Sequence, residues 1–339
     1  MTATLNGLGY GRDLIDAALR NAVARLDPDT GLVVSYHLGW CDPQGNPLTG
    51  NGGKAIRPIM TLLAARACGA ADTAALPGAV AVELVHNFSL VHDDLMDRDR
   101  ERRHRATVWA VWGDATAVLA GDMMLSLAHD VLLESDSPHA APAGRVIAAA
   151  TRDLIRGQAQ DIAFERRNDV GLQECLDMAF GKTGALLGAS SAVGAVLAGA
   201  DEPTVAAMSD YGRHVGLAFQ LVDDVLGIWG EPEITGKPVY SDLRSHKKSL
   251  PITWTLEQDD TTASELREWL AAEPDSMVTE SELRSVATLI DHSGARDWTL
   301  AEARRRVELA QRALDSIDLL TTPRAALCDL AQYIVDREA

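Results

Sequence analysis

Residues 90–103, LVHDDLMDRDRERR, contain four aspartates, and three of them, Asp93, Asp94 and Asp97, form one run. Asp93 and Asp97 are four residues apart, so in a helix they share one face, and Asp94 is turned from Asp93 by about 100°. Carboxylates at a helix end form a site of hard oxygen ligands, which suits Mg²⁺ with substrate phosphate oxygens. A solvated charged face is the alternative, but the preceding residues VELVHNFSLVH are largely apolar. Because unpaired carboxylates beside a core are costly, we predict a metal site.

Basic residues precede the aspartates in the segment GGKAIRP, residues 52–58. Its glycines allow the backbone to approach a ligand closely. Lys54 and Arg57 are three residues apart, so in a first helical turn both could face one anion, helped by the positive end of the helix. A loop with two solvated cations fits the pattern equally well.

An arginine pair, Arg102 and Arg103, follows the aspartates. Each guanidinium can bond two oxygens in a fork, which suits a diphosphate. The alternative is salt bridges to Asp99 and Glu101. His86 lies two helical turns before the first aspartate on the same face. A lone histidine in an apolar helix is usually a satisfied core residue, so its role depends on that of the aspartates.

A second acidic helix end occurs about 130 residues later, where an apolar stretch reaches Gln220, Asp223 and Asp224. A segment rich in glycine and proline follows it and carries Lys237 and Lys247. This segment could fold over a phosphate site as a lid. Two acidic helix ends, each followed by cations, indicate one cavity with metal sites that face each other.

Apolar residues recur at three- and four-residue spacing along most of the 339 residues, with no competing run of alternating β-branched residues. We therefore predict one all-α domain over residues 1–339. Residues 182–199 are apolar on all sides and predict a central buried helix that neighbours approach closely. The predicted helices span residues 11–26, 56–68, 73–97, 116–134, 142–166, 172–199, 203–229, 280–290, 293–318 and 323–336.

The formal net charge of −18 argues against nucleic acid as a partner, but it does not exclude an anionic substrate. The four cysteines are scattered, which indicates free thiols in a reducing compartment. No signal peptide is evident, and no stretch of about 18 uninterrupted apolar residues predicts a membrane span. We expect a cytoplasmic location.

Taken together, the motifs resemble the trans-isoprenyl diphosphate synthase (polyprenyl synthetase) family. The matching elements follow the family's order and spacing over residues 50–251. They are GGKAIRP, ELVHNFSLVHDDLMD, the arginine pair, GQAQD at 157–161, Lys182-Thr183, FQLVDD at 219–224 and TGKPVYSDLRSHKKSLP.

The resemblance implies an isoprenoid-synthase-type helical bundle around a deep central cavity, usually a homodimer. It also implies condensation of isopentenyl diphosphate with an allylic diphosphate, assisted by about three Mg²⁺ ions. Asp93 and Asp97 would bind two ions with support from Asp94, and Asp223 would bind a third. The allylic diphosphate would be held by Arg102, Lys182 and Lys237, with Thr183 and Gln220 nearby. The isopentenyl diphosphate would be held by Lys54, Arg57, His86 and Arg103, and Lys247 would close the lid.

The sequence departs from the family pattern at several positions. Gly227 stands where the second motif often has a third aspartate, so we expect weaker support for the metal there. His104, Ala106 and Trp109 replace residues that are commonly glycine, proline and histidine. The first motif keeps all three carboxylates, so loss of Asp93 or Asp97 should cost more activity than loss of Asp224.

Product length should depend on the residues that line the path of the growing tail. Phe88 lies five residues before Asp93, about 7.5 Å along the helix axis, and Ser89 beside it is small. A single bulky residue at this depth resembles geranylgeranyl (C20) synthases, with farnesyl (C15) synthesis as the alternative. A buried core role for Phe88 remains equally open.

Two other classes of protein compete with this interpretation. A terpene cyclase, which is a lyase, needs a second metal motif with serine and glutamate at fixed spacing, but Leu172 and Leu176 occupy these positions after Asn168-Asp169. A non-catalytic partner subunit tends to lose the aspartates, which are all present here. We therefore predict a magnesium-dependent prenyltransferase.

Overall fold

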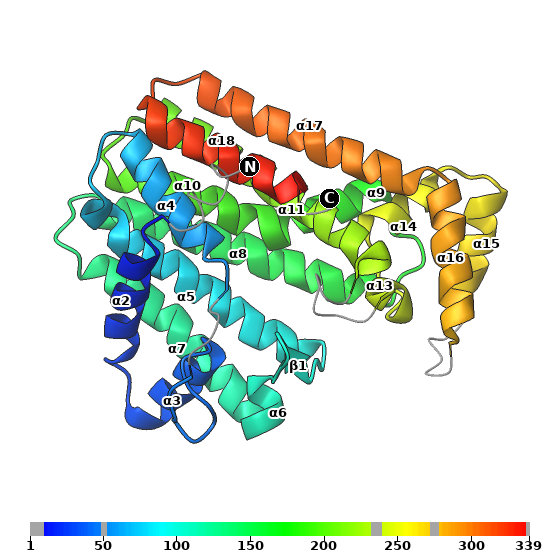
Figure 1. The fold of residues 1–339 in the computed structure, drawn as a ribbon, viewed down its shortest axis with the longest axis horizontal. Helices are drawn as coiled ribbons and strands as arrows, with labels where there is room; N and C mark the ends of the chain where they lie inside the picture. Colours follow the sequence, from blue (N-terminus) through cyan, green and yellow to red (C-terminus); the bar gives the residue numbers. More distant parts are fainter. Residues whose placement is uncertain (1–9, 49–52, 232–238, 272–277, 337–339) are drawn as a thin grey trace. The chain divides into compact units, whose positions relative to one another are not determined.

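The computed structural model describes residues 10–48, 53–231, 239–271 and 278–336, and helices account for most of them (Figure 1). The all-α prediction is therefore confirmed. The α-helices are α2 (Arg12–Val23), α3 (Pro28–His37), α4 (Ile56–Ala67), α5 (Asp72–Met96), α6 (Val108–Trp112), α7 (Asp114–Leu133), α8 (Ala140–Phe164), α9 (Leu172–Ala179), α10 (Ala185–Leu197), α11 (Glu202–Trp229), α13 (Ser241–Arg244), α14 (Leu250–Glu257), α15 (Thr261–Ala271), α16 (Glu280–His292), α17 (Ala295–Asp315) and α18 (Thr321–Val335).

Helix contacts divide the chain into two compact units. The first unit comprises Met1–Ala149, Ala189–Ser209 and Leu314–Leu330, and the second comprises Ala150–Gly188, Asp210–Ala313 and Ala331–Ala339. The single domain over the whole chain stays a prediction.

The core of the first unit forms around α5, which packs between α4 and α7 (Figure 1). Small residues let the helices approach one another closely. A Cβ atom placed on Gly194 of α10 would lie 2.2 Å from the carbonyl oxygen of Thr61 in α4. The prediction that neighbours approach the helix at 182–199 closely is thus confirmed for this part of α10.

The second unit has two clusters of buried apolar side chains. One joins α11 to α9 and includes Leu217, Leu221 and Val222. The other joins α13, α14, α15 and α16 and includes Leu243, Ile252 and Leu283. A π-helical turn, η1 (Phe180–Gly184), connects α9 to α10.

Several helices are not predicted by the sequence pattern. Helix α3 begins with Pro28 at its first turn, and the Asp27 side chain accepts a hydrogen bond from the Thr30 N–H, but this helix has almost no amphipathic periodicity. Helices α6, α13, α14 and α15 are short or lie in segments that we did not assign. Gly294, with φ at 87°, separates α16 from α17, close to the break that the sequence predicted between the helices at 280–290 and 293–318.

A two-stranded hairpin, β1 (Glu101–Arg102) and β2 (Arg105–Ala106), interrupts the helices directly after the first aspartate motif. Arg103 and His104 form its turn with φ at 53° and 60°. Two consecutive left-handed residues are what the tightest hairpin turn requires, and glycine adopts them most easily. This requirement gives a physical reason for the glycine that the family commonly has in place of His104.

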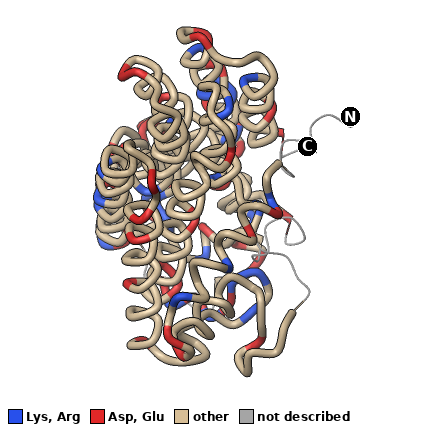
Figure 2. Tube along the Cα trace, turned by 90° about the vertical axis from the view of Figure 1, so that its left-hand side faces the viewer, with Lys and Arg blue, Asp and Glu red and all other residues tan. Residues whose placement is uncertain are grey.

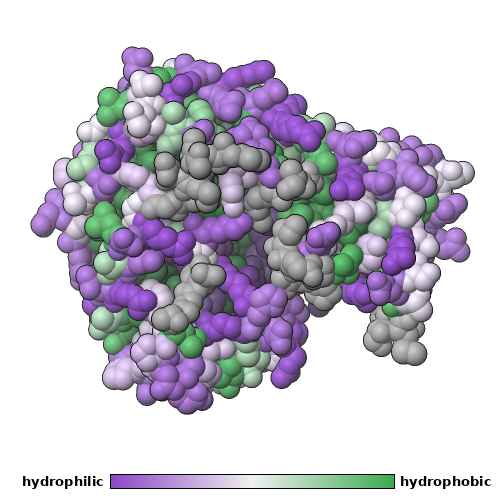
Figure 3. Space-filling view, viewed as in Figure 1, coloured by the Kyte–Doolittle hydropathy of each residue, from purple (hydrophilic) through white to green (hydrophobic). Residues whose placement is uncertain are grey.

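Three helical segments are long and apolar enough, by length and composition alone, to cross a membrane: Asp72–Met96, Asp114–Leu133 and Leu172–Leu197. Within the protein 67%, 39% and 83% of their most apolar windows are buried. The absence of a membrane span therefore stays a prediction. Acidic and basic segments are interspersed along the helices (Figure 2), and the face drawn in Figure 3 is mostly hydrophilic, with smaller hydrophobic patches.

Candidate active site

The first aspartate motif lies at the end of α5, where the helix leaves the core of the first unit. Asp97 is the C-cap, and its N–H donates to the Asp93 carbonyl at 2.8 Å. Asp93 and Asp97 thus lie one turn apart at the helix end, as the spacing predicted, with Asp93 half-buried and Asp97 exposed.

Asp94 is different, because it is 2% exposed and tied to the hairpin. Arg102 Nε and Nη2 both reach its Oδ1 atom at 2.8 Å. Burial raises the pKa of Asp94, and Arg102 opposes this effect. The alternative partners of Arg102, Asp99 and Glu101, are not the ones it contacts. Asp94 therefore fixes Arg102 in place beside the other two carboxylates.

The basic segment GGKAIRP is only partly helical. Ala55 is the N-cap of α4 with φ at 52°, and the helix begins at Ile56, so Arg57 lies in its first turn while Lys54 precedes it. The expectation that both cations share a helical turn is therefore wrong for Lys54. Gly52 lies outside the described residues.

Three arginines influence the imidazole of His86 on α5. Burial lowers the pKa of His86 well below its ordinary value, and Arg57, Arg103 and Arg102 lower it further. Arg103 is exposed to solvent on one side, and partial desolvation together with Arg102 lowers its pKa. So much positive charge around a neutral imidazole is the environment expected for a polyanion such as diphosphate.

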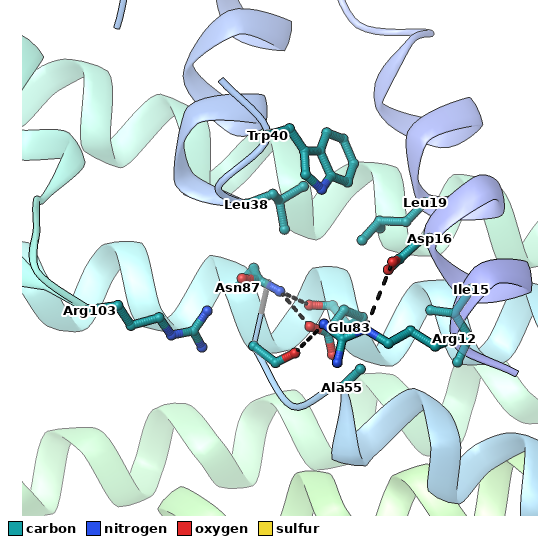
Figure 4. Close-up of a pocket in the computed structure, with 11 residues that line it drawn as sticks. Arg12, Ile15, Asp16, Leu19, Leu38, Trp40, Ala55, Glu83, Asn87 and Arg103 are labelled. Carbon is teal, nitrogen blue, oxygen red and sulfur yellow. Dashed lines mark hydrogen bonds and ion pairs between the residues drawn. The ribbon is translucent and has the colours of Figure 1, made fainter. Parts of the chain in front are cut away.

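A small cavity of about 30 Å³ lies beside these cations in the first unit (Figure 4). Arg12 of α2 donates through Nη2 to the Gly53 carbonyl at 2.8 Å. A Cβ atom on Gly53 would lie 2.7 Å from Arg103 Nη2, so the Arg103 guanidinium packs directly against this glycine and would have to shift for a larger residue. Arg12 therefore holds the glycine segment from one side while Arg103 packs on the other. The sequence analysis missed Arg12, which has no motif around it.

Glu83 and His37 are two further residues that the sequence analysis missed. Glu83 lines the cavity, and Asn87 Nδ2 donates to its Oε1 at 3.1 Å. Burial raises the pKa of Glu83, against the attraction of Arg57. The Nε2 atom of His37 is buried without a hydrogen-bond partner in the described part of the chain, and burial lowers its pKa to about 3.

The second aspartate motif belongs to the second unit and lies on α11. Gln220 Nε2 donates to Asp224 Oδ1 at 2.8 Å, and Thr183 Oγ1 donates to Gln220 Oε1 at 2.7 Å. The Leu250 N–H donates to Asp224 Oδ2 at 2.9 Å, so both oxygens of this carboxylate have partners. Burial raises the pKa of Asp224 to about 6. Asp224 is thus a buried link between α11 and α14, whereas Asp223 is only half-buried.

Lys182 lies in the π-helical turn η1 and pairs with Asp161 of α8 at 2.6 Å. Burial alone would raise the pKa of Asp161, but Lys182 and Lys247 outweigh it, and the pKa is lowered. Single π-helical turns are frequent at functional sites. Asp161 closes the GQAQD segment, so this segment's last residue positions Lys182.

Lys247 is surrounded by carboxylates in the second unit. Asp242 raises its pKa most, burial opposes this, and Asp224 and Asp161 add to the rise. Lys247 therefore stays charged among three acidic side chains. Lys237, the other lysine of the predicted lid, lies outside the described residues.

The residues proposed to set chain length are both buried in α5. Phe88 is 5% exposed and packs edge-to-face on His92 with ring centroids 5.1 Å apart. Ser89 is 7% exposed, and its hydroxyl donates to the His86 carbonyl at 2.8 Å. Their depth below Asp93 is as the helical spacing predicted, while their role in chain length stays a prediction.

Each acidic helix end offers hard oxygen donors that fit Mg²⁺. Among the described residues no three His, Cys, Asp or Glu side chains form a ready-made metal cluster. Mg²⁺ is usually bound by one or two carboxylates and completed by waters and substrate phosphates, so the carboxylates at each helix end could hold it. The competing cyclase motif finds no support, because Asp169 is an exposed residue paired with Arg167 at 2.9 Å.

The sequence model of the polyprenyl synthetase family matches residues 40–286. The chain belongs to this family. It is 59% identical over 337 residues, 99% of this chain and 94% of the relative, to a protein named (2E,6E)-farnesyl diphosphate synthase from Mycobacterium bovis. It is 39% identical over 321 residues, 94% of this chain and 90% of the relative, to a geranylgeranyl diphosphate synthase from Mycobacterium tuberculosis.

Solved structures of family members show the same fold. A polyprenyl synthetase from Streptomyces coelicolor A3(2) matches with a TM-score of 0.94 and 49% identity, over 98% of this chain and 99% of that one. A polyprenyl synthase from Caulobacter crescentus CB15, complexed with calcium and isoprenyl diphosphate, matches with a TM-score of 0.86 and 30% identity, over 99% and 97%. The prediction of a prenyltransferase is therefore confirmed at the level of the family.

Proposed function

We propose that this family member condenses isopentenyl diphosphate with an allylic diphosphate to give farnesyl diphosphate. The observation that carries the reaction is the pairing of an aspartate with a half-buried cation beside each aspartate motif, Asp94 with Arg102 in the first unit and Asp161 with Lys182 in the second. The C15 product was our alternative to C20. It is favoured by the 59% identity to a relative named farnesyl diphosphate synthase, against 39% to a geranylgeranyl diphosphate synthase.

The first set of residues, in the first unit, would bind the diphosphate groups of both substrates. Asp93 and Asp97 would ligate Mg²⁺, and Arg102, fixed by Asp94, would bind the allylic diphosphate. The isopentenyl diphosphate would lie against the cations Lys54, Arg57 and Arg103, with His86 among them. A neutral imidazole there can donate one hydrogen bond without adding to the repulsion among the arginines.

The second set of residues, in the second unit, would bind the diphosphate that leaves the allylic substrate. Asp223 would ligate a further Mg²⁺, so that about three ions act in all, and Lys182 and Lys237 would bind diphosphate oxygens. Thr183 and Gln220 form the hydrogen-bonded pair that supports Asp224.

The chemistry follows from where charge develops. The bond between the allylic carbon and the diphosphate oxygen breaks, and bound magnesium would stabilise the negative charge that grows on the leaving group. Arg102, Lys182 and Lys237 would donate hydrogen bonds to the same oxygens. The isopentenyl double bond then attacks the allylic cation, and loss of a proton, which we assign to the released diphosphate, completes the new double bond. Apolar walls keep water from quenching the cation.

We also propose a cytoplasmic homodimer. Helix α7 carries apolar side chains that solvent reaches, with Val118, Leu119 and Leu133 at 42%, 66% and 58% exposure. Such a face fits contact with a second copy of the chain. Light scattering on the purified protein tests the oligomeric state. All four cysteines are free thiols, in keeping with a reducing compartment.

The product assay tests the proposed function. Purified protein is incubated with Mg²⁺, isopentenyl diphosphate and, in turn, dimethylallyl, geranyl or farnesyl diphosphate, and product length is measured by mass spectrometry. We expect the first two primers to be elongated to C15 and farnesyl diphosphate to be a poor primer. Efficient elongation of farnesyl diphosphate to C20 would refute the C15 assignment, and no elongation of any primer would refute the function.

A further inference from the structure

The hairpin that carries the arginine pair, at the end of α5 (Figure 1), has a strained turn. Arg103 and His104 both have positive φ, at 53° and 60°, and neither is glycine. This conformation brings the Cβ atom of an L-residue too close to the following carbonyl oxygen, which disfavours each such residue by roughly 10-fold. Each strand of the hairpin has only 2 residues. So short a ladder cannot hold a strained turn by itself, and contacts with other elements must hold it.

Tyr36 of α3 contacts both residues of the second strand, β2. Its hydroxyl donates to the Ala106 carbonyl at 2.7 Å, and the Arg105 guanidinium lies over its ring, 4.2 Å from the centroid. The ring also packs edge-to-face on Trp112 of α6, with centroids 4.9 Å apart, which fixes the tyrosine itself. Tyr36 is only 5% exposed, so these contacts are shielded from water.

The position of β2 determines where the arginine pair lies. Arg105 is the partner of Arg102 in the register of the hairpin. Arg105 Nη2 also donates to the Cys41 carbonyl at 2.9 Å, so β2 is tied at a second point to the segment that follows α3. Arg102 bonds the buried Asp94 carboxylate, and Arg103 comes next in the turn. Both arginines therefore depend on the contacts between β2 and the region around α3.

We propose that Tyr36 is a positioning residue for Arg102 and Arg103, because it holds β2, and through β2 the strained turn, in the conformation that binds diphosphate. The proposal deepens the proposed function and rests on it, since the two arginines are assigned there to the diphosphates of the two substrates. When the tyrosine contacts are lost, the turn relaxes. The apparent affinity for diphosphate then falls with the fraction of molecules that keep the binding conformation.

The test measures the dissociation constant of inorganic pyrophosphate in the presence of Mg²⁺ by titration calorimetry. Tyr36→Phe removes only the hydroxyl and should weaken binding by about 3- to 10-fold, the value of one hydrogen bond. Tyr36→Leu also removes the ring that Arg105 and Trp112 contact, and it should weaken binding by more than about 10-fold. No prenyl substrate is present, so the result does not depend on whether the protein elongates any primer.

A rescue variant separates positioning of the arginines from a general loss of stability. Glycine adopts positive φ without strain, so His104→Gly should let the turn keep its conformation with fewer supporting contacts. The double variant Tyr36→Phe/His104→Gly should therefore regain most of the pyrophosphate affinity that Tyr36→Phe loses. If Tyr36 only stabilised the fold, a change in an exposed turn residue would not restore the affinity.

Tyr10→Phe is the matched control, because it removes a tyrosine hydroxyl in the same unit. That hydroxyl donates to Asp72 at 2.7 Å, at the opposite end of α5 from the hairpin, so the variant should bind pyrophosphate as the wild type does.

Wild-type affinity in Tyr36→Phe and Tyr36→Leu, a loss that His104→Gly does not restore, or an equal loss in Tyr10→Phe would overturn the proposal. Tyr36→Phe carries the test if Tyr36→Leu does not fold. A wild-type protein that binds no pyrophosphate would refute the proposed function itself, and this inference with it.

Discussion

Gly157 is the point at which α8 comes closest to the π-helical turn that carries Lys182. A Cβ atom on Gly157 would lie 2.3 Å from the Lys182 backbone nitrogen and 2.8 Å from the Gly181 carbonyl carbon. The atoms in the way are backbone atoms, which cannot rotate aside as a flexible side chain can. Gly157→Ala should therefore push η1 away from α8 and disturb the 2.6 Å ion pair between Lys182 and Asp161.

The size of the effect follows from two opposing contributions. Alanine is better than glycine in a helix by about 1 kcal/mol. Overpacking in a tight core costs about 1–3 kcal/mol, and backbone at 2.3 Å places this site at the upper end. The net destabilisation should be about 2 kcal/mol, which for a chain of 339 residues corresponds to a fall in the unfolding midpoint of about 3 °C. A shift of about 1 Å at a catalytic group can cost about 100-fold in rate.

A glycine of the same helix provides the control. A Cβ atom on Gly144 would meet nothing closer than 3.9 Å. Gly144→Ala should therefore gain the higher helix stability of alanine without overpacking, and its unfolding midpoint should rise. Calorimetry and steady-state kinetics on both variants test the reasoning. We expect Gly157→Ala to unfold earlier and to lose kcat for allylic substrates, while Gly144→Ala keeps both. Equal behaviour of the two variants would refute the close-approach argument.

Four other predictions follow from the site. Asp93→Asn should lower kcat by about 100-fold or more, while Asp224→Asn costs less, as kinetics at saturating Mg²⁺ can show. Asp224 has a folded-state pKa of about 6, above its ordinary 3.8, so its contribution to stability is full below about pH 4 and lost as pH rises through about 6. Asp224→Asn should flatten the unfolding midpoint over that window, and an unchanged profile would contradict the assignment. Phe88→Ala should lengthen the product, and chains no longer than those of the wild type would show that Phe88 does not limit them. Arg12→Met should raise KM for isopentenyl diphosphate with little change in KM for the allylic substrate, whereas Arg20→Met on the same helix should change neither.

The long amphipathic helices and the two aspartate motifs could be predicted from sequence because each depends on local spacing. Asp93 and Asp97 are one turn apart in any helix, and the apolar residues before them required burial of the segment. The prediction failed where one segment has no periodic signal, as in α3, or where helix ends depend on backbone conformation, as at Ala55.

Contacts between distant segments could not be predicted at all. Arg12 reaches Gly53 across 41 residues, and the Asp242 carboxylate of α13 packs directly against Gly227 of α11. Neither contact can be recognised from the spacing of residues in the sequence, because each depends on tertiary packing. The partner of Arg102 is a third case. The motif was predicted correctly, but burial decided which of the nearby carboxylates Arg102 contacts, and that carboxylate belongs to Asp94.

The most direct test of the central claim is the release of pyrophosphate from geranyl diphosphate, measured with and without isopentenyl diphosphate and Mg²⁺. We predict release only when both substrates and Mg²⁺ are present, in an amount equal to the farnesyl diphosphate formed, with EDTA stopping the reaction and added Mg²⁺ restoring it. Release without isopentenyl diphosphate, as a cyclase would give, or no release under any condition, would contradict the claim that this chain is a magnesium-dependent prenyl diphosphate synthase.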